Sequence, residues 1–346
     1  MFDAAEFDSH EAVNFVTDAD SGLRAIIAVH STRRGSAIGG CRAWRYANDR
    51  EALRDALRLS RGMTYKAAMA GAPFGGGKAV VMVDPARPKT PAMMHALGRA
   101  IERMGGSYFT GEDVGTTCAD MVEIRTATAH VMGLPVEQGG SGDPSPNTAL
   151  GCFEGIRASV RHALGKDDLR DVRVAIQGAG NVGYHLCALL ASAGAQITVA
   201  DVDRTRAQRC AEKFGARMVD PARLFEVEAE VLAPCALGGI LNADTIPRLR
   251  VRIVAGGANN QLESAACGAA LRDRRILYAP DYVINAGGMI QLAAELTGMP
   301  AAEISERVRA IATTLLRVYR FAQERAVPTN AAADLLASQM LVEACP

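Results

Sequence analysis

Residues 172–203 read VRVAIQGAGNVGYHLCALLASAGAQITVADVD. An apolar strand pattern leads into a glycine-rich turn, an amphipathic helix, a second apolar strand and a closing acid. Gly178, Gly180 and Gly183 have the G-x-G-x-x-G spacing, and Asp201 ends the second strand. The first glycine permits a tight turn, the second lets the backbone approach a pyrophosphate, and the third lets the helix pack on the strand. The stretch therefore predicts a doubly wound α/β domain that binds a dinucleotide.

The same stretch indicates how the dinucleotide is held. Backbone N–H groups at the start of the helix, around Asn181 and Val182, would face the phosphates. Asp201 can accept hydrogen bonds from a ribose diol and would repel a 2′-phosphate, which favours NAD over NADP. Arg204 and Arg206 leave that choice open. A βαβ unit whose glycines serve only packing is the alternative interpretation.

Three further segments, 229–242, 252–262 and 276–290, are predicted strands that end in small or amide residues. Such endings are typical of the carboxyl edge of a parallel sheet, where a cofactor lies. Asn259 and Asn260 could offer amide donors there, or could only cap a turn.

The length of 346 residues predicts two domains. The densest Gly/Pro/Ser stretch, QGGSGDPSPNT at 138–148, marks the expected boundary. We expect a substrate-binding domain at 1–140 and a Rossmann domain at 141–325. The segment 326–346 is expected to be a helix that packs back on the first domain, and residues 300–346 together read as one long and one short helix.

Charge and composition limit the partners. The chain has 38 basic and 38 acidic residues and no basic block, so neither nucleic acid nor a membrane surface is an expected partner. No run of about 18 apolar residues and no signal-like segment is present, which predicts a cytoplasmic protein with a small-molecule substrate. Eight cysteines without a C-x-x-C pair and six scattered histidines predict free thiols and no metal site.

Two lysines stand in the apolar, glycine-rich stretch TYKAAMAGAPFGGGKAVV, residues 64–81. Lys66 falls about 120° from the arginine row of a helix that is expected to begin at Asn48 or Asp49, so we expect it to be partly buried and to meet an anion. Lys78 follows Gly75–Gly77 at the mouth of an apolar strand, where three absent side chains are expected to leave space for a ligand. Burial and a second ammonium nearby both disfavour a charged Lys78, so it could act as a base near neutral pH. Two lysines that merely extend their ammonium groups to solvent are the alternative.

The stretch GEDVGT at 111–116 adds two carboxylates, Glu112 and Asp113. A carboxylate near a neutral lysine can orient it, accept from a substrate ammonium, or carry a proton. Either residue could instead cap a loop.

Nine motifs, in order across about residues 10–340, resemble the leucine/phenylalanine/valine branch of the amino acid dehydrogenases. They are GGCR, LRLSRGMTYKAA, FGGGKAVV, TGEDVGTT, GSGDPSPNTA, QGAGNVGYHL, APCALGGILN, GANNQL and APDYVINAGG. The resemblance implies an N-terminal α/β substrate domain, a doubly wound NAD domain, a cleft between them and a homo-oligomer. It also implies reversible NAD-dependent oxidative deamination of an L-amino acid to a 2-oxo acid and ammonia.

Residue by residue, the resemblance implies that Lys66 pairs with the substrate α-carboxylate, that Lys78 is the general base that activates water, and that Asp113 assists proton transfer. The remaining roles concern binding: Gly39 and Gly40 line the substrate cleft, Asn259 or Asn260 helps to hold the carboxylate, Thr148 contacts the nicotinamide end and Ala236 contacts the cofactor.

The resemblance also bears on the substrate. Glutamate-specific relatives place a basic side chain where this chain has Ile38, so an apolar residue there argues against glutamate. Gly111, Met289 and Leu292 would line an apolar pocket. Gly111 offers more room than the alanine typical of leucine-specific members, which favours phenylalanine or another aromatic substrate. Leucine or another branched-chain amino acid comes second, because GEDVGTT and DPSP look like the leucine enzymes.

There are two rival interpretations, one within the enzymes and one from another class. A 2-hydroxy acid dehydrogenase commonly relies on a catalytic histidine, and no histidine here stands in a comparable motif. A catalytically silent NAD-binding protein would have no need of Lys66, Lys78 and Asp113 together.

Overall fold

The computed structural model of the chain describes residues 6–84 and 86–343. The chain divides into two compact units. The first comprises Met1–Asp143, Leu292–Met299 and Ala337–Pro346, and the second comprises Pro144–Gln291 and Pro300–Leu336. The division after Asp143 lies inside the Gly/Pro/Ser-rich stretch at 138–148.

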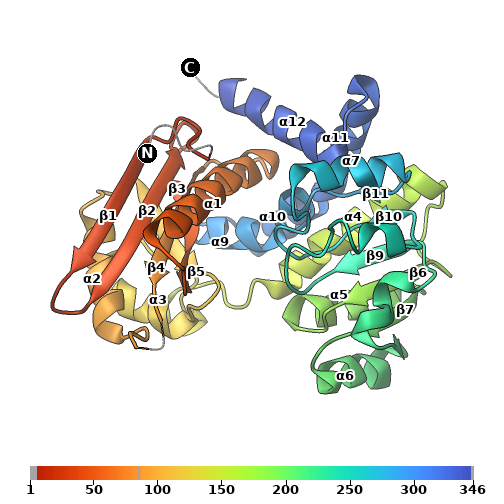
Figure 1. Cartoon of the computed structure of the whole chain (residues 1–346), viewed down its shortest axis with the longest axis horizontal. Coiled ribbons are helices and arrows are strands. Elements are labelled where there is room, and N and C mark those ends of the chain that lie inside the picture. Colours follow the sequence, from red (N-terminus) through yellow and green to blue (C-terminus); the bar gives the residue numbers. More distant parts are fainter. Residues whose placement is uncertain (1–5, 85, 344–346) are drawn as a thin grey trace. The chain divides into compact units, whose positions relative to one another are not determined.

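The first unit is built on a five-stranded mixed sheet with the order β1-β2-β4-β3-β5 (Figure 1). Neighbours β1/β2 and β2/β4 are antiparallel, whereas β4/β3 and β3/β5 are parallel. Its elements are β1 (Ala12–Asp18), β2 (Leu23–Ser31), β3 (Ala37–Trp44), α1 (Asp49–Met69), β4 (Gly75–Met82), α2 (Pro91–Glu102), β5 (Tyr108–Glu112), α3 (Cys118–Arg125) and the 3₁₀ turn η1 (Val136–Gln138).

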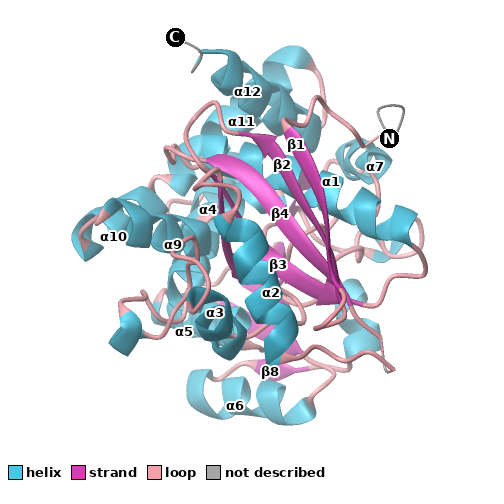
Figure 2. Ribbon diagram, turned by 90° about the vertical axis from the view of Figure 1, so that its left-hand side faces the viewer, coloured by secondary structure: helices cyan, strands magenta, loops and turns pink. Residues whose placement is uncertain are grey.

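Helices cover both faces of this sheet. Alternate side chains of a strand point to opposite faces, and in β2 and β4 the side chains on both faces are apolar and need to be buried. On one face, Ile26 and Val80 pack with Leu57 of α1. On the other, Ile27 and Val81 belong to the larger core formed with α2 and α3, and Figure 2 shows α2 lying across the strands. Even-numbered positions of β4 therefore face α1.

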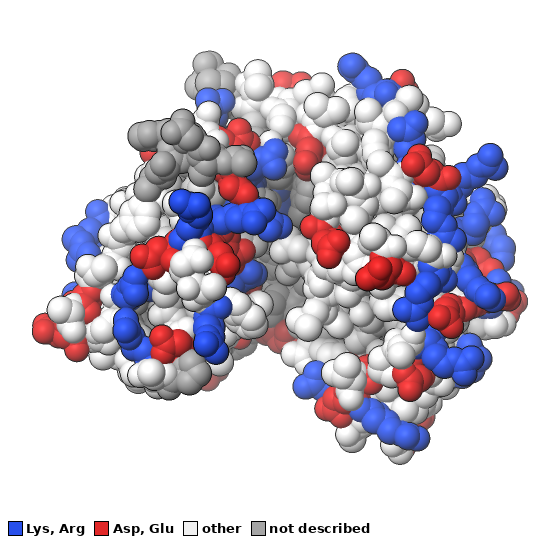
Figure 3. All heavy atoms as spheres, viewed as in Figure 1, with Lys and Arg blue, Asp and Glu red and all other residues white. Residues whose placement is uncertain are grey.

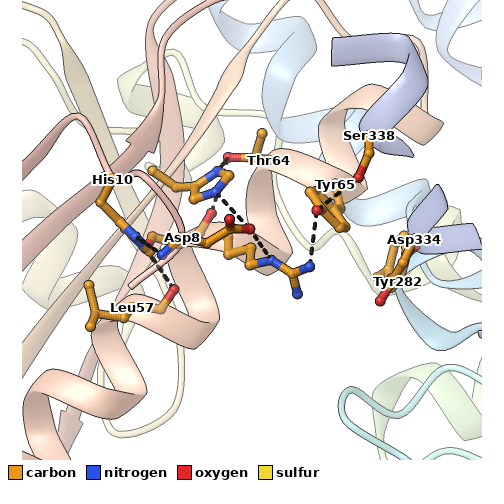
Figure 4. Close-up of polar contacts among 11 residues, drawn as sticks. Asp8, His10, Leu57, Thr64, Tyr65, Tyr282, Asp334 and Ser338 are labelled. Carbon is orange, nitrogen blue, oxygen red and sulfur yellow. Dashed lines mark hydrogen bonds and ion pairs between the residues drawn. The ribbon is translucent and has the colours of Figure 1, made fainter. Parts of the chain in front are cut away.

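Polar contacts anchor α1 along its length. Its N-cap is Asn48, whose Oδ1 accepts from the Glu51 N–H at 3.0 Å, in line with the predicted start. Figure 4 shows His10 reaching the carbonyl of Leu57, with its Nε2 3.1 Å from that oxygen, while the hydroxyl of Tyr65 lies 3.0 Å from Ser338 Oγ. These contacts fix the helix that carries Lys66.

The second unit contains a parallel six-stranded sheet with the order β11-β10-β9-β6-β7-β8. Its elements are α4 (Ser145–Leu164), β6 (Arg173–Gln177), α5 (Asn181–Ser192), β7 (Gln196–Ala200), α6 (Arg204–Phe214), β8 (Arg217–Met218), η2 (Pro221–Glu226), β9 (Val231–Pro234), η3 (Ile246–Arg248), β10 (Ile253–Val254), α7 (Ala265–Asp273), β11 (Leu277–Tyr278), α8 (Asp281–Ile284), α10 (Ala301–Arg309) and α11 (Ile311–Arg325). Successive strands run outward from β6 to β8, and β9 then returns to the other side of β6. This reversal is the topological switch point of a doubly wound sheet, so the predicted α/β fold is confirmed.

Two helices, α9 (Gly287–Thr297) and α12 (Thr329–Glu343), contain residues of both units, since the divisions fall after Gln291 and after Leu336. In the second unit, the hydroxyl of Tyr282 on α8 donates to Asp334 on α12 at 2.9 Å (Figure 4).

The predicted strands at 229–242, 252–262 and 276–290 are all present but short: β9, β10 and β11 have four, two and two residues. In the last segment Pro280 follows β11, and α8 and α9 come next. One prediction about secondary structure is wrong. Residues 300–343 form three helices, not two, since the helical path breaks at Ala310 between α10 and α11.

On the face shown in Figure 3, lysine and arginine side chains lie among aspartates and glutamates. Across the described residues, no helix combines the length and the apolar character needed to cross a bilayer.

Candidate active site

A buried ion pair joins the two residues predicted to carry the chemistry. Lys78 lies on β4 with its side chain 6% exposed, and its Nζ is 2.8 Å from Oδ2 of Asp113. Asp113 directly follows β5. A turn fixes it there: its N–H donates to Thr116 Oγ1 at 2.9 Å, and that hydroxyl lies 2.8 Å from the carbonyl oxygen of Cys41. The alternative carboxylate, Glu112, is exposed.

Arg42 completes this cluster, and the sequence analysis assigned it no role. On β3, Cys41 and Ala43 face the core under α2, so Arg42 faces the same side of the sheet as Lys78. Its Nε donates to Oδ2 of Asp113 at 2.9 Å, and its Nη1 lies 3.0 Å from Oδ2 of Asp55. The sequence did contain a signal for this role. In the strand motif GGCR, side chains alternate between the two faces of the sheet, so Arg42 lies on the same face as Gly40.

The two cations determine the charge of Asp113. Burial disfavours ionisation, but Lys78 and Arg42 outweigh burial and lower the pKa of the Asp113 carboxyl to about 2. Burial acts against the Arg42 guanidinium too, yet Asp113 and Asp55 raise its pKa. Asp113 is therefore an anion at neutral pH. An ionised Asp113 can orient Lys78 and accept a hydrogen bond from an ammonium group, two of its three predicted roles.

Lys66 lies in the last turn of α1 and is half-buried, as the helical periodicity predicts. Thr64, two residues earlier, is fully buried, and its Oγ1 is 2.9 Å from Nδ1 of His30. The backbone that carries Lys66 is thus fixed from the β2 side.

The glycines before Lys78 do not leave space for a ligand, so that prediction is wrong. A Cβ on Gly77 would lie 2.6 Å from the Tyr108 ring, and one on Gly76 would run into Thr64 of α1. A Cβ on Gly75 would meet the carbonyl oxygen of Ser31. These glycines let the neighbouring strand and helix approach β4 closely, and Lys78 stands beside a packed backbone.

Gly39 and Gly40 lie on β3 and are similarly crowded. A Cβ on Gly39 would meet the carbonyl oxygen of Gly77, and one on Gly40 would lie 2.8 Å from Cβ of Asp113.

Gly111, in contrast, has room for a side chain. It is paired in register with Gly40, and a Cβ there would make only ordinary contacts, 3.7 Å from Met132 Cε. Leu292 approaches within 3.7 Å of a Cβ built at Gly133, next to Met132, so the first unit brings Gly111, Met132 and Leu292 into one apolar neighbourhood. The sequence analysis missed Met132.

Two other residues were predicted to bear on the substrate. Ile38 is fully buried on β3, and Met289 is buried on the part of α9 that belongs to the second unit.

In the second unit the glycine-rich turn has the geometry that its spacing predicts. Gly178 has φ +93°, and a Cβ on it would lie 2.8 Å from Cβ of Ala236, after β9. A Cβ on Gly183 would run into the carbonyl oxygen of Gly178, so only glycine lets α5 pack on β6. At Gly180, the N-cap of α5, the nearest atom to a built Cβ is Arg206 Nη1 at 3.9 Å. The helix N-terminus at Asn181 is thus open to a phosphate group.

Asp201 follows β7, and both of its carboxylate oxygens accept backbone hydrogen bonds. Oδ2 accepts from the N–H of Ala179 at 2.7 Å, and Oδ1 accepts from the N–H of Asp203 at 2.8 Å. The first bond ties Asp201 to the glycine-rich turn, and each oxygen keeps a lone pair for a ribose hydroxyl. Arg206 pairs with Asp203 at 3.3 Å, so it is already bound to a carboxylate.

Other predicted cofactor and substrate residues also lie in the second unit. Val182 and Thr148 both approach Gly257 after β10, with Val182 Cγ1 2.9 Å and Thr148 Cγ2 3.8 Å from a Cβ built there. Asn259 and Asn260 are exposed. Asn259 Oδ1 accepts from Asn285 at 2.7 Å, and Asn260 has φ +52°, which fits a turn.

The residues of the turn fit a dinucleotide: an open N-terminus, a glycine where the backbone must be bare, and a carboxylate at the end of β7. Within residues 6–84 and 86–343, no three His, Cys, Asp or Glu side chains are grouped so that they could hold a metal ion. The seven cysteines of that part of the chain are free thiols.

Comparisons with known proteins agree with both units. The family described as "Glu/Leu/Phe/Val dehydrogenase, dimerisation domain" matches residues 10–130, and "Glutamate/Leucine/Phenylalanine/Valine dehydrogenase" matches 139–205 and 199–345. A leucine dehydrogenase from Geobacillus stearothermophilus is 46% identical across 99% of this chain and 93% of that protein. A phenylalanine dehydrogenase from Caldalkalibacillus thermarum is 42% identical across 97% of this chain and 92% of that protein.

Solved structures give the same result. The L-tryptophan dehydrogenase from Nostoc punctiforme matches with a TM-score of 0.86 and 41% identity, over 97% of each chain. A hetero-hexameric glutamate dehydrogenase from Thermus thermophilus, in a leucine-bound form, matches with a TM-score of 0.77 and 26% identity, over 97% of this chain and 89% of that chain. The chain therefore belongs to the Glu/Leu/Phe/Val dehydrogenase family, whose members use a nicotinamide cofactor.

Proposed function

We propose that this protein catalyses the reversible, NAD-dependent oxidative deamination of an apolar L-amino acid to the 2-oxo acid and ammonia. The observation that carries the proposal is the buried Lys78–Asp113 pair, 2.8 Å apart, in a chain of this family. Burying an ammonium group and a carboxylate costs free energy, and such buried charged groups are common at catalytic sites.

Each lysine has one task in this proposal. A bound nicotinamide would accept the hydride that leaves the substrate Cα. Lys66 pairs with the substrate α-carboxylate and so fixes the amino acid by its constant part. Lys78, in its neutral form, takes a proton from the water that attacks the imino carbon. Asp113 holds Lys78 in place and accepts a hydrogen bond from the substrate amino group.

The remaining predicted residues bind without moving protons. Gly39 and Gly40 offer backbone to the substrate, and Asn259 or Asn260 helps to hold its carboxylate. Thr148 contacts the nicotinamide end, and Ala236 contacts the cofactor beside the glycine-rich turn.

NAD is the proposed cofactor because Asp201, directly after β7, can accept from a ribose diol and would repel a 2′-phosphate. The pairing of Arg206 with Asp203 supports the choice, since that guanidinium already has a carboxylate partner. The ratio of kcat/KM for NAD to that for NADP tests the proposal: Asp201→Ala should lower the ratio, and a wild-type ratio below one would refute it.

The proposed substrate is phenylalanine or another aromatic amino acid. Gly111, Met132 and Leu292 are apolar, and Gly111 leaves room for a methyl group. Ile38 is fully buried and cannot pair with a distal carboxylate, which argues against glutamate. Leucine is the second candidate, because the leucine dehydrogenase named above is 46% identical to this chain and the phenylalanine dehydrogenase 42%.

A homo-oligomer is part of the proposal. It is supported by the "dimerisation domain" description that matches residues 10–130. Sedimentation of the full chain should give a mass of at least two subunits.

The experiment follows NAD reduction at alkaline pH with L-phenylalanine, L-tryptophan, L-leucine, L-valine and L-glutamate. Lys78→Ala is compared with Lys166→Ala, an exposed lysine in the loop after α4. We expect turnover of apolar substrates that Lys78→Ala lowers by at least about a hundredfold and Lys166→Ala leaves intact. NAD binding without turnover of any amino acid would refute the proposed function.

A further inference from the structure

We propose that Arg42, held by Asp55, whose carboxylate in turn accepts from Tyr46, is a positioning residue that sets the charge state of the Lys78–Asp113 pair. The inference rests on the proposed function, because it explains how Lys78 could be neutral beside an anion. It gives roles to three residues that the proposed mechanism leaves unused.

The contacts form one continuous chain from β4 to α1. Lys78 Nζ and Arg42 Nε both bind the same oxygen, Oδ2 of Asp113, at 2.8 and 2.9 Å. Arg42 Nη1 lies 3.0 Å from Oδ2 of Asp55, and the hydroxyl of Tyr46 donates to that oxygen at 2.7 Å. Arg42 is therefore held at both ends, with only 18% of its side chain exposed.

The shared oxygen has an electrostatic consequence. A lone carboxylate 2.8 Å away would hold Lys78 as an ammonium group and so oppose its use as a base. The Arg42 guanidinium binds the same oxygen, and its positive charge weakens the electrostatic attraction between the carboxylate and the Lys78 ammonium. Oδ1 of Asp113 has no hydrogen-bond partner among the described residues, so it stays available to a substrate ammonium.

Asp55 acts in the opposite direction at longer range. It fixes the guanidinium, but its negative charge also cancels part of the positive charge of Arg42. Removing Arg42 should therefore favour the ammonium form of Lys78, and removing the charge of Asp55 should favour the neutral amine. Two substitutions in one chain of contacts thus have predicted effects of opposite sign.

Of the other titratable groups near the pair, three stay neutral and two are paired with each other. Burial raises the pKa of Cys41 on β3 to about 12, and it also raises the pKa values of Tyr46 and of Tyr108 on β5. Lys89 and Asp120 form their own ion pair at 2.5 Å.

Two charged groups remain unchanged in every variant proposed below. They are Lys66 on α1 and Glu112 at the end of β5.

The test uses the full-length enzyme with Arg42→Met, Arg42→Lys, Asp55→Asn and Tyr46→Phe. The matched control is Arg45→Met, since Arg45 is exposed and lines the same cavity of about 400 Å³ as Arg42, Tyr46 and Asp55. The first readout is the pH dependence of kcat for oxidative deamination. The second is the pH dependence of trace acetylation of Lys78 by acetic anhydride, read by mass spectrometry, which reports the neutral amine without turnover.

With Arg42→Met, we expect the pH of half-maximal kcat and of half-maximal labelling to rise by about one unit. With Asp55→Asn, both should fall by about half a unit. Arg42→Lys should recover part of the wild-type profile, and Arg45→Met should match the wild type. Tyr46→Phe removes a hydrogen-bond donor from the Asp55 carboxylate and leaves its negative charge less screened, so both midpoints should rise slightly. If Arg42→Met does not fold, the isosteric Asp55→Asn and Tyr46→Phe variants decide the question.

Shifts of the same sign for Arg42→Met and Asp55→Asn, or losses of kcat without any pH shift, would overturn the inference and show a merely structural role. Failure of the proposed function has a different signature: no amino acid is turned over, while the labelling of Lys78 still shifts in the two opposite directions.

Discussion

Replacing Gly40 by alanine should separate the Lys78–Asp113 pair. The added Cβ would lie 2.7 Å from the carbonyl oxygen of Glu112 and 2.8 Å from Cβ of Asp113. Ordinary contacts begin near 3.4 Å, so Asp113 must retreat by about 0.6 Å. The ion pair at 2.8 Å would then open to about 3.4 Å, beyond hydrogen-bonding distance.

Misplacement of this size at a catalytic pair lowers kcat by about 10- to 100-fold, and overpacking costs about 1–3 kcal/mol of stability. Steady-state kinetics and the thermal midpoint of the full chain measure the two effects. Gly111→Ala is the matched control for folding, since Gly111 faces Gly40 across the β3–β5 register and has room for a methyl group. An unchanged kcat and midpoint for Gly40→Ala would refute the argument that close packing at Gly40 positions Asp113.

Four further predictions follow from single residues. Gly183→Ala should weaken NAD binding, measured by calorimetry, and lower the thermal midpoint, because its Cβ would run into the Gly178 carbonyl oxygen. Gly111→Ala should move the kcat/KM ratio from phenylalanine towards leucine by about tenfold; a ratio that does not move would remove Gly111 from the pocket. Asp113, with its pKa lowered to about 2, contributes stability that is present above an ordinary carboxyl pKa near 4 and lost as the pH falls through about 2. Between about pH 5 and pH 2 the wild type should lose about 2 kcal/mol more than Asp113→Asn in urea unfolding. Burial, reinforced by the neighbouring His10, lowers the pKa of His30 to about 4, so stability present above about pH 6.5 is lost on acidification to about pH 4. Over that range the wild type should lose about 3 kcal/mol more than His30→Asn, and equal losses would show that His30 titrates normally.

Features that depend on neighbouring residues could be predicted from the sequence. The glycine-rich turn requires only three glycines between a strand and a helix, and the structure gives each glycine the expected geometry. The N-cap at Asn48 is equally local, since its side chain satisfies the Glu51 N–H three residues on. The strand predicted at 276–290 is present as β11 but ends at Tyr278, because Pro280 follows and the rest of the segment is helical.

Features that depend on register could not be predicted. Arg42 reaches Asp113 only because β3 pairs with β5 so that Gly40 is opposite Gly111. That pairing joins segments about seventy residues apart, and no local pattern specifies it. Lys78 was predicted to be a catalytic residue, and the structure shows it buried in an ion pair with Asp113. The contact between Arg42 and the same carboxylate could not be predicted, because Arg42 lies on a third strand, β3.

The glycines of the first unit show what this arrangement costs. They occupy three adjacent strands: Gly75, Gly76 and Gly77 on β4, Gly39 and Gly40 on β3, and Gly111 on β5. None has a positive φ, so no turn requires them. Each glycine in a strand lowers stability by about 0.5–1 kcal/mol relative to alanine. At all of these positions except Gly111, a Cβ would collide with a neighbouring strand or with α1. The missing side chains therefore let β4, β3 and β5 bring Lys78, Arg42 and Asp113 within hydrogen-bonding distance, and a substitution that strengthened these strands would separate the charged groups that they carry.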